Sequence, residues 1–253
     1  MMAAFSSIDQ LSKEASVSTA SVVRFANALG YEGYSELQAK LQEYCRSLLI
    51  PVRRLDSNYK NSKNGESILH SVCEQQLSNL KDIDTFEVDK KISKTVELIR
   101  NSRHIYTLGV RGSYAASYYL GHHLDRVLRN CDILESDDRL PEYLERMTSE
   151  DLLILINMPR YDRRILTAAK IVKDKGVKLV AISDTLLAPY ASIADVFFSA
   201  PNQSSDFHNS LVSTFLIIET IISSVISSEY LKARENLSNM EPVLNQLNTF
   251  IDT

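Results

Sequence analysis

Hydrophobic and polar positions alternate with helical spacing in the first fifty residues of the chain. The i, i+3, i+4, i+7 pattern that predicts one apolar helix face is formed by Val22, Phe25, Ala26 and Leu29. Ser18 is a favourable N-cap for this helix, and Gly30 stands where a left-handed C-cap is preferred. A short helix carrying Ile8, Leu11 and Ala15 is expected just before it, so the pattern predicts two helices joined by a tight turn.

From residue 104 onward the pattern changes to short apolar runs that alternate with helical segments. The predicted strands are Ile105–Val110, Asp132–Glu135, Leu152–Asn157, Lys178–Ser183 and Val196–Phe198. The predicted helices between them are Ser113–Leu128, Pro141–Met147, Asp162–Lys175 and Ala188–Ile193. Strands that alternate with helices indicate right-handed βαβ crossovers and a parallel sheet covered on both faces. The fold class is therefore α/β, a three-layer α/β/α domain with a five-stranded parallel sheet behind a small all-α N-terminal domain.

The remaining segments set the expected domain boundaries. Residues 51–65 are polar and nearly free of apolar side chains, which is typical of a linker. We therefore expect an N-terminal helical domain over residues 1–50, a linker over 51–65 and the α/β domain over 66–253. Further helices are predicted over Glu66–Asp84, Val88–Asn101, Phe207–Ser227 and Glu229–Phe250, the last with a possible break near Pro242.

The polar face of the second N-terminal helix carries candidate chemistry. Ala20, Ser21, Arg24 and Asn27 point away from the apolar face, and Arg and Asn can make bidentate contacts to base edges. Small residues at the start of such a helix allow close approach to a major groove, as in helix-turn-helix proteins. The alternative is an ordinary amphipathic helix in an all-α subdomain.

The run Val17–Leu37, VSTASVVRFANALGYEGYSEL, closely resembles the DNA-binding region of RpiR/MurR-type bacterial transcription regulators. In that family further helices precede this run, and we expect helix Ser35–Leu49 to cover part of the face that they would occupy here. The resemblance implies that the chain binds operator DNA. The residues expected to read or hold DNA are Thr19, Ala20, Ser21, Arg24, Asn27, Tyr34 and Lys40.

Charge and composition narrow this hypothesis. The chain of 253 residues has a formal net charge of −4, and residues 1–54 hold six Lys and Arg against five Asp and Glu. Contact with DNA must therefore be local and must depend on dimerisation. The three cysteines, at positions 45, 73 and 131, form no CxxC motif, which predicts thiols in a reducing compartment. With no targeting segment, and with polar residues interrupting the most apolar run, Leu211–Ile226, we expect a cytoplasmic protein that does not span a membrane.

A second candidate site lies where the first predicted strand ends. The segment Ile105–Ser117, IYTLGVRGSYAAS, turns on Gly109 and Gly112 before a helix begins. Such a turn can bind an anion through backbone N–H groups and the helix dipole. It lacks the full GxGxxG pattern of a dinucleotide site, and a tight turn that serves packing alone is the alternative.

The order of elements resembles the sugar isomerase (SIS) domain, over about Ser67–Ser228. The resemblance implies a phosphosugar ligand, no cofactor, and a dimer or tetramer formed through this domain. It places Ser113 on a phosphate-contacting serine and Asn157–Asp162 on the second ligand loop, where Asp162 replaces a hydroxyl and would repel phosphate. Arg111 and Arg160 offer cationic forks that suit phosphate. The residues expected at the ligand are Gly109, Arg111, Gly112, Ser113, Asn157, Arg160, Tyr161, Ser183 and His208.

No catalytic residue is predicted. Sugar isomerisation or ether cleavage needs a positioned base, and neither Glu135 nor Glu142 forms a recognisable acid/base pair. His122 and His123 are adjacent on a helix and diverge, which argues against a metal pair. The combined hypothesis is a transcription regulator that senses a sugar phosphate and controls sugar-metabolism genes. The alternatives are a SIS-domain sugar-phosphate isomerase or etherase, and a degenerate SIS protein that only dimerises.

Overall fold

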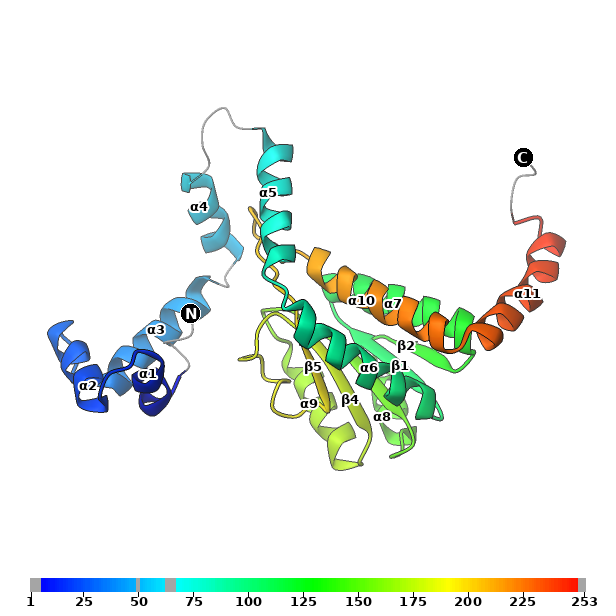
Figure 1. Cartoon of the computed structure of the whole chain (residues 1–253), viewed down its shortest axis with the longest axis horizontal. Coiled ribbons are helices and arrows are strands. Elements are labelled where there is room, and N and C mark those ends of the chain that lie inside the picture. Colours follow the sequence, from blue (N-terminus) through cyan, green and yellow to red (C-terminus); the bar gives the residue numbers. More distant parts are fainter. Residues whose placement is uncertain (1–5, 49–50, 62–66, 250–253) are drawn as a thin grey trace. The chain divides into compact units, whose positions relative to one another are not determined.

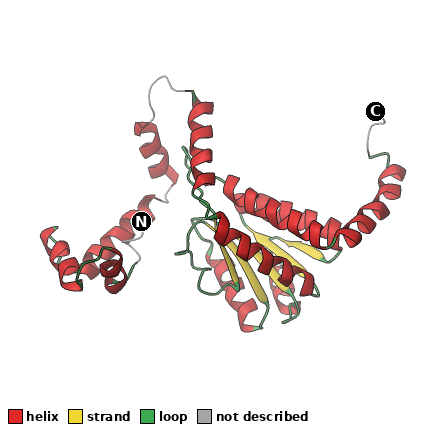
Figure 2. Cartoon of the chain, viewed as in Figure 1, coloured by secondary structure: helices red, strands yellow, loops and turns green. Residues whose placement is uncertain are grey.

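The computed structural model describes residues 6–48, 51–61 and 67–249. The chain divides into two compact units, Met1–Ser67 with Ser205–His208, and Ile68–Ser204 with Asn209–Thr253. The first unit is helical and the second contains the sheet, as Figure 2 shows. The predicted fold class is therefore confirmed.

The N-terminal unit consists of short helices (Figure 1). They are α1 (Ile8–Glu14), α2 (Thr19–Ala28), α3 (Tyr34–Leu48) and α4 (Pro51–Asn61). Helix α4 occupies most of the segment that we interpreted as a linker, and Pro51 stands at its first position, where proline is favoured because its missing N–H would have no partner. The polar composition of this segment therefore did not exclude a helix over Pro51–Asn61.

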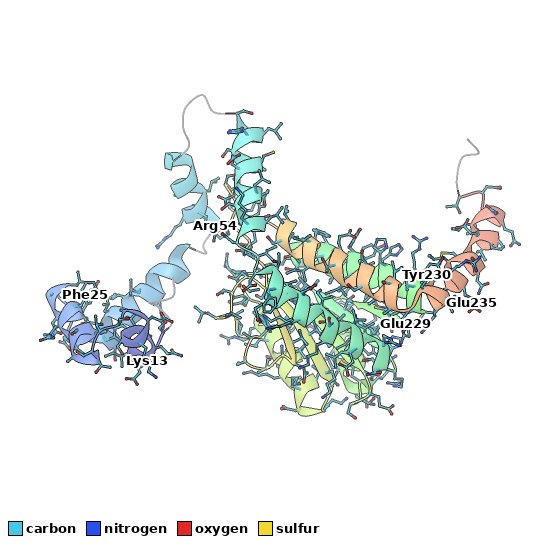
Figure 3. The ribbon with its side chains drawn as sticks, viewed as in Figure 1. Lys13, Phe25, Arg54, Glu229, Tyr230 and Glu235 are labelled. Atoms are coloured by element: carbon cyan, nitrogen blue, oxygen red, sulfur yellow. The ribbon has the colours of Figure 1, made fainter. Side chains whose placement is uncertain are left out.

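The apolar face predicted for α2 is only half buried. Val22 and Ala26 are buried, with 5% and 0% of their surface exposed. Phe25, labelled in Figure 3, and Leu29 remain 60% and 53% exposed. Helices α1 and α3 both pack against α2, and within the described part of this unit they cover only the side that carries Val22 and Ala26.

The second unit is a three-layer α/β/α domain around a five-stranded parallel sheet of order β2-β1-β3-β4-β5 (Figure 1). The strands are β1 (Ile105–Gly109), β2 (Cys131–Leu134), β3 (Leu152–Ile156), β4 (Lys178–Ser183) and β5 (Val196–Ser199). The helices are α5 (Ile68–Lys81), α6 (Thr85–Asn101), α7 (Gly112–Leu128), α8 (Leu140–Arg146), α9 (Arg163–Asp174), α10 (Val212–Ser228) and α11 (Tyr230–Gln246).

Two separate cores lie on the two faces of this sheet. Helices α6, α7 and α10 bury one core against Ile154 and Val180, whereas α8 and α9 bury the other against Leu153 and Leu179. Alternate residues along a strand point to opposite faces, so a strand such as LLILI, buried along its whole length, feeds both cores. Figure 1 shows helices on both sides of the sheet.

Three sequence expectations need correction in this unit. Residues 188–193 form successive turns rather than a helix, with Ala191 N bonded to the Ala188 carbonyl and Ile193 N to that of Tyr190. A six-residue segment makes too few helical bonds to offset nucleation, and Tyr190 is fully buried. Helix α10 begins at Val212, not at residue 207, and α11 continues through Pro242 without a break.

No single helix in the described residues is long and apolar enough to cross a membrane. The pair α10 and α11 meets the length and composition criteria only when the two are taken together, and they are bent by 97° at their junction.

Candidate functional site: an exposed helix face and the carboxyl edge of the sheet

Helix α2 is closed at both ends by the residues that the sequence indicated. The side chain of Ser18 accepts a hydrogen bond from Ser21 N at 3.2 Å, so Ser18 is the N-cap. Gly30 has a φ of +87°, which favours glycine, and its N–H donates to the Asn27 carbonyl at 3.0 Å. These caps satisfy backbone groups that the ends of a helix leave unpaired, so they stabilise both ends of α2.

The polar face of α2 is turned to solvent. Thr19, Ala20, Arg24 and Asn27 are exposed, and Ser21 is half-buried. Arg24 Nη2 donates to Ser21 Oγ at 3.1 Å, and the Ser21 and Ser18 hydroxyls lie 3.0 Å apart. These contacts draw the Arg24 guanidinium toward the start of the helix, the end that enters a major groove in helix-turn-helix proteins.

The two residues predicted to hold DNA phosphates differ in their positions. Lys40 is exposed on α3. Tyr34 is 6% exposed, and its hydroxyl donates to the Ser6 carbonyl at 2.8 Å, which ties the start of the described chain to α3. Burial, with a contribution from Glu14, raises the pKa of Tyr34. Tyr34 is therefore a packing residue in this structure, which argues against the predicted contact with a DNA phosphate.

The second site lies at the topological switch point of the sheet, between β1 and β3. Strand β1 is followed by β2 on one side and lies beside β3 on the other, so the loops after β1 and β3 diverge to opposite faces. Open α/β sheets bind ligands at the carboxyl ends of their strands at such a switch point. The loop after β1 carries Arg111, Gly112 and Ser113, and the loop after β3 carries residues 157–162.

Gly109 allows these elements to approach closely. A Cβ atom at Gly109 would lie 2.5 Å from the Ser113 carbonyl oxygen and 2.7 Å from Ser117 Oγ, so only glycine fits. At Gly112, the first residue of α7, a Cβ would meet nothing within 4 Å. The N-cap of α7 is Arg111, at a φ of 53°, and its side chain makes no capping hydrogen bond. No side chain caps the start of α7, where Ser113 N and Tyr114 N donate to the Val110 and Arg111 carbonyls, each at 3.1 Å.

Three of the predicted ligand residues are buried and bonded within the protein. Ser113 Oγ accepts from Met158 N at 3.3 Å, and Ser183 Oγ donates to the Asn157 carbonyl at 2.7 Å. Asn157 Nδ2 donates to the hydroxyl of Tyr190 at 2.6 Å. Ser113 is 5% exposed, Ser183 is 0% exposed and Asn157 is 3% exposed. They bring the ends of β1, β3 and β4 together and fix the shape of this edge.

The charged residues form the rim of the same edge. Arg111 and Arg160 are exposed, and Arg111 Nη2 lies 4.0 Å from Asp162 Oδ2. Asp162 is the N-cap of α9, where its Oδ1 accepts from Arg164 N at 2.8 Å. The side chain of Asp162 is 28% exposed against 70% for that of Arg111. Arg111, Arg160 and the exposed Arg163 therefore lie on or beside the same two loops as the partly exposed Asp162.

Asp184 is a functional candidate that sequence analysis missed. Its Oδ1 accepts from the Tyr161 hydroxyl at 2.6 Å and from Ser183 Oγ at 3.2 Å. Burial raises the pKa of Asp184, although both hydrogen bonds oppose the shift. Burial and the neighbouring Asp184 also raise the pKa of Tyr161. The available signal was an acidic residue directly after a buried strand, at the edge where ligands bind.

His208 belongs with the N-terminal unit rather than with the sheet unit that holds the other predicted ligand residues. It is exposed, and its backbone carbonyl accepts from Arg54 Nη2 at 2.9 Å. His122 stacks on Tyr118, and His123 packs edge-on against Tyr119, so both belong to aromatic contacts. Among the described residues no group of three or more His, Cys, Asp or Glu side chains is placed to hold a metal ion.

Comparison with known proteins matches both units to family models. Residues 2–47 match the helix-turn-helix domain of the rpiR family, and residues 98–224 match the SIS domain. An uncharacterised HTH-type transcriptional regulator of Thermotoga maritima is 26% identical over 96% of this chain and 87% of its own length. The HTH-type transcriptional regulator HexR of Escherichia coli is 22% identical over 95% of this chain and 83% of its own length.

Solved structures show the same fold. The sugar isomerase domain of an RpiR transcription factor from Sphaerobacter thermophilus superposes with a TM-score of 0.63 at 23% identity, over 69% of this chain and 96% of that one. The NanR protein of Vibrio vulnificus, complexed with ManNAc-6P, superposes with a TM-score of 0.64 at 19% identity, over 97% of this chain and 88% of that one. The matches to both domains, in this order along one chain, identify the protein as a member of the RpiR family of helix-turn-helix transcriptional regulators with a SIS domain.

Proposed function

We propose that this regulator reads operator DNA with the exposed face of α2 and senses a phosphorylated sugar at the carboxyl edge of its sheet. The observation that carries the first half is the capped helix whose polar side chains face solvent. Arg24 and Asn27 are exposed and of the types that pair with guanine and adenine edges. Thr19, Ala20 and Ser21 leave the start of the helix small enough for a groove, with Lys40 as a phosphate contact.

The ligand half rests on the switch point and its two arginines. The start of α7 carries the positive end of its helix dipole, and the exposed Arg111 and Arg160 offer guanidinium forks on the loops after β1 and β3. Gly109, Gly112, Ser113, Asn157, Tyr161 and Ser183 shape this edge. NanR, whose structure resembles this one, was solved with a sugar phosphate, which supports the same ligand class here.

We also propose that the protein works as a homodimer or homotetramer assembled through the SIS unit. Helices α10 and α11 expose large apolar side chains, among them Leu216, Tyr230 and Leu231 at 45%, 60% and 78%. Two DNA-binding units would then meet two half-sites, which compensates for an N-terminal domain with little net positive charge. His208 stays a candidate contact to a ligand bound by a neighbouring subunit.

The proposal is tested by measuring binding to the DNA upstream of the protein's own gene with and without sugar phosphates. We expect retarded DNA in a gel-shift assay, and a change in affinity when one sugar phosphate is added. We expect the same compound to raise the melting temperature. Absence of DNA binding, together with no thermal shift by any sugar phosphate, would contradict both halves.

One observation favours the isomerase alternative. Asp184 is a half-buried carboxylate with a raised pKa at the ligand edge, which is the environment of many acid/base catalysts. The Tyr161 hydroxyl already occupies its Oδ1. Aldose–ketose conversion of the bound sugar phosphate, followed by NMR and lost in Asp184→Asn, would establish the enzyme, whereas binding without conversion supports the regulator.

A further inference from the structure

Helix α11 packs against the rest of the sheet unit along one of its faces. Ala233 is buried, Asn236 Nδ2 donates to the Val127 carbonyl at 2.7 Å, and the Asn236 carbonyl accepts from Arg129 Nη2 at 2.9 Å. Residues three positions apart share a face of a helix, so Ala233 and Asn236 mark the side that lies on α7. Among the described residues of α11, Ala233 alone is buried. Most of the surface of this helix is therefore exposed or only half-buried.

A second face of α11, next to the first, has the spacing of a helix that pairs with another helix. Tyr230, Arg234, Leu237, Glu241 and Leu244 follow one another at steps of four, three, four and three residues. We call this set the α11 seam. Tyr230, labelled in Figure 3, is 60% exposed, Arg234 and Glu241 are exposed, and Leu237 and Leu244 are half-buried. The alternating steps keep the five side chains on one side of the helix, so a single partner helix can contact them all.

The two ends of the α11 seam differ in shape. Near its start, Ile226 of α10 joins Tyr230, Ala233 and Leu237 among the residues that line a hollow of about 370 Å³, beside the bend of 97° between the two helices (Figure 1). At its far end, Leu244 lies in the last turn of α11 and is half-buried. A partly apolar hollow at one end and an apolar side chain at the other can meet when two such helices run in opposite directions.

The charges of the α11 seam favour the same arrangement. Arg234 and Glu241 are exposed, and neither side chain forms an ion pair or a hydrogen bond with the part of the chain that the structure describes. They are seven residues apart, about 10 Å along the helix axis, which is too far for them to pair with each other. Two copies of the seam placed side by side in parallel would bring Arg234 against Arg234. Placed antiparallel, they bring each Arg234 opposite a Glu241, so the seam is complementary in charge to itself.

We infer that α11 pairs antiparallel with α11 of a second copy of this chain, about a two-fold axis that passes between Leu237 and Ser238. Two ion pairs between Arg234 and Glu241 lie on either side of the contact between the two Leu237 side chains. Leu244 of each copy lies toward the hollow at the start of the other copy's seam. Both copies use the same surface, as a two-fold interface requires. This inference rests on the homo-oligomer of the proposed function and names the surface that joins its subunits.

The test reverses the two charges one at a time and then together. Self-association of the full chain is measured by sedimentation equilibrium over a range of concentrations. Arg234→Glu and Glu241→Arg each turn both ion pairs into pairs of like charge, so each variant should weaken association at least about tenfold. The double variant restores two pairs of opposite charge with their positions exchanged, and it should associate like the unmodified chain. Both positions are exposed, so neither change should disturb the fold of the subunit.

Lys232→Glu and Glu235→Arg are the matched controls. Both residues are exposed on α11 but outside the seam, and these changes should leave association unchanged; Glu235 is labelled in Figure 3. Association that Arg234→Glu and Glu241→Arg leave unchanged would overturn the inference while leaving the proposed homo-oligomer in place. A double variant that associates as weakly as the single variants would also overturn it, because the two charges would then not pair with each other. An unmodified chain that stays monomeric would refute the proposed assembly itself.

Discussion

Helix α2 and the carboxyl edge of the sheet use similar residue types in opposite ways. On α2, Thr19, Arg24 and Asn27 are exposed, and Arg24 contacts only Ser21 among the hydrogen bonds described. At the sheet edge, Ser113, Asn157 and Ser183 are buried, and their hydrogen bonds are made with Met158 N, the Tyr190 hydroxyl and the Asn157 carbonyl. A helix presents its recognition face directly, whereas a loop site needs an inner layer of polar residues before outer residues such as Arg111 can recognise anything.

The largest expected effect is on stability, and it distinguishes the closely packed Gly109 from the unobstructed Gly112. Gly109→Ala places a methyl group 2.5 Å from the Ser113 carbonyl oxygen and should lower the free energy of unfolding by about 2–4 kcal/mol. Gly112→Ala, three residues along, meets nothing within 4 Å and should be neutral or slightly stabilising. Chemical denaturation measures both. Similar values for the two variants would show that the edge is not tightly packed.

The second prediction concerns the pH dependence of stability and Asp195, which lies at the opposite, amino edge of the same sheet. Burial acts to raise the pKa of Asp195, but hydrogen bonds from Lys173 Nζ at 2.6 Å and Leu179 N at 2.7 Å outweigh it, so the pKa is lowered. A lowered pKa in the folded state means that the carboxylate stabilises the fold above its unfolded pKa near 4, and that this stability is lost as the pH falls through that value and below.

Asp195→Asn should therefore cost about 2 kcal/mol at pH 7, and the difference from the unmodified protein should shrink as the pH falls below about 4. Thermal unfolding across this pH range measures it. Asp132, which is half exposed near the same edge, provides a control, and Asp132→Asn should have a smaller effect at pH 7. A difference that stays constant with pH would contradict the role assigned to the Asp195 charge.

A third prediction concerns the outer layer of the ligand edge. Arg111→Ala should weaken binding of a sugar phosphate about tenfold, because it removes a cationic fork without disturbing a buried contact. Its effect on the free energy of unfolding should be small, since 70% of the side chain is exposed. Calorimetry and thermal unfolding separate the two effects. Unchanged ligand affinity would place the phosphate elsewhere.

The smallest effect concerns the cap of α2. Ser18→Ala removes the acceptor for Ser21 N and should destabilise α2 by about 1 kcal/mol, whereas Ser18→Asn keeps an acceptor and should behave like the unmodified protein. Hydrogen exchange of the α2 amides measures this. The sheet unit should show no change in either variant, and a spread of faster exchange into its strands would refute the separation of the two units.

These comparisons explain how far the sequence could predict the molecule. Strands β1 and β3 were found because each is a fully buried, largely apolar run, and the α2 caps were found because Ser18 and Gly30 act locally. The turns over residues 188–193 were missed, since apolar spacing does not distinguish a short helix from turns that bury Tyr190. The exposure of Phe25 and Leu29 could not be predicted either, because it depends on where neighbouring helices pack.

Prediction of the candidate site was limited for the same reason. The loops after β1 and β3 were identified from glycines and from family resemblance. Which of their residues face inward depends on bonds between strands, such as that from Ser183 to the Asn157 carbonyl. Asp184 was missed because a single acidic residue after a strand has no distinctive spacing, and its contact with Tyr161 joins residues 23 positions apart.

The most direct test of the account is Arg24→Ala, assayed for both activities on the same preparation. Fluorescence anisotropy with the upstream DNA should show a loss of affinity of at least about tenfold, the range of one bidentate base contact. Calorimetry with the sugar phosphate should show unchanged affinity, because Arg24 lies on the exposed face of α2 in the helical unit. Unchanged DNA binding, or an equal loss of both affinities, would contradict the division of DNA reading and ligand sensing between the two units.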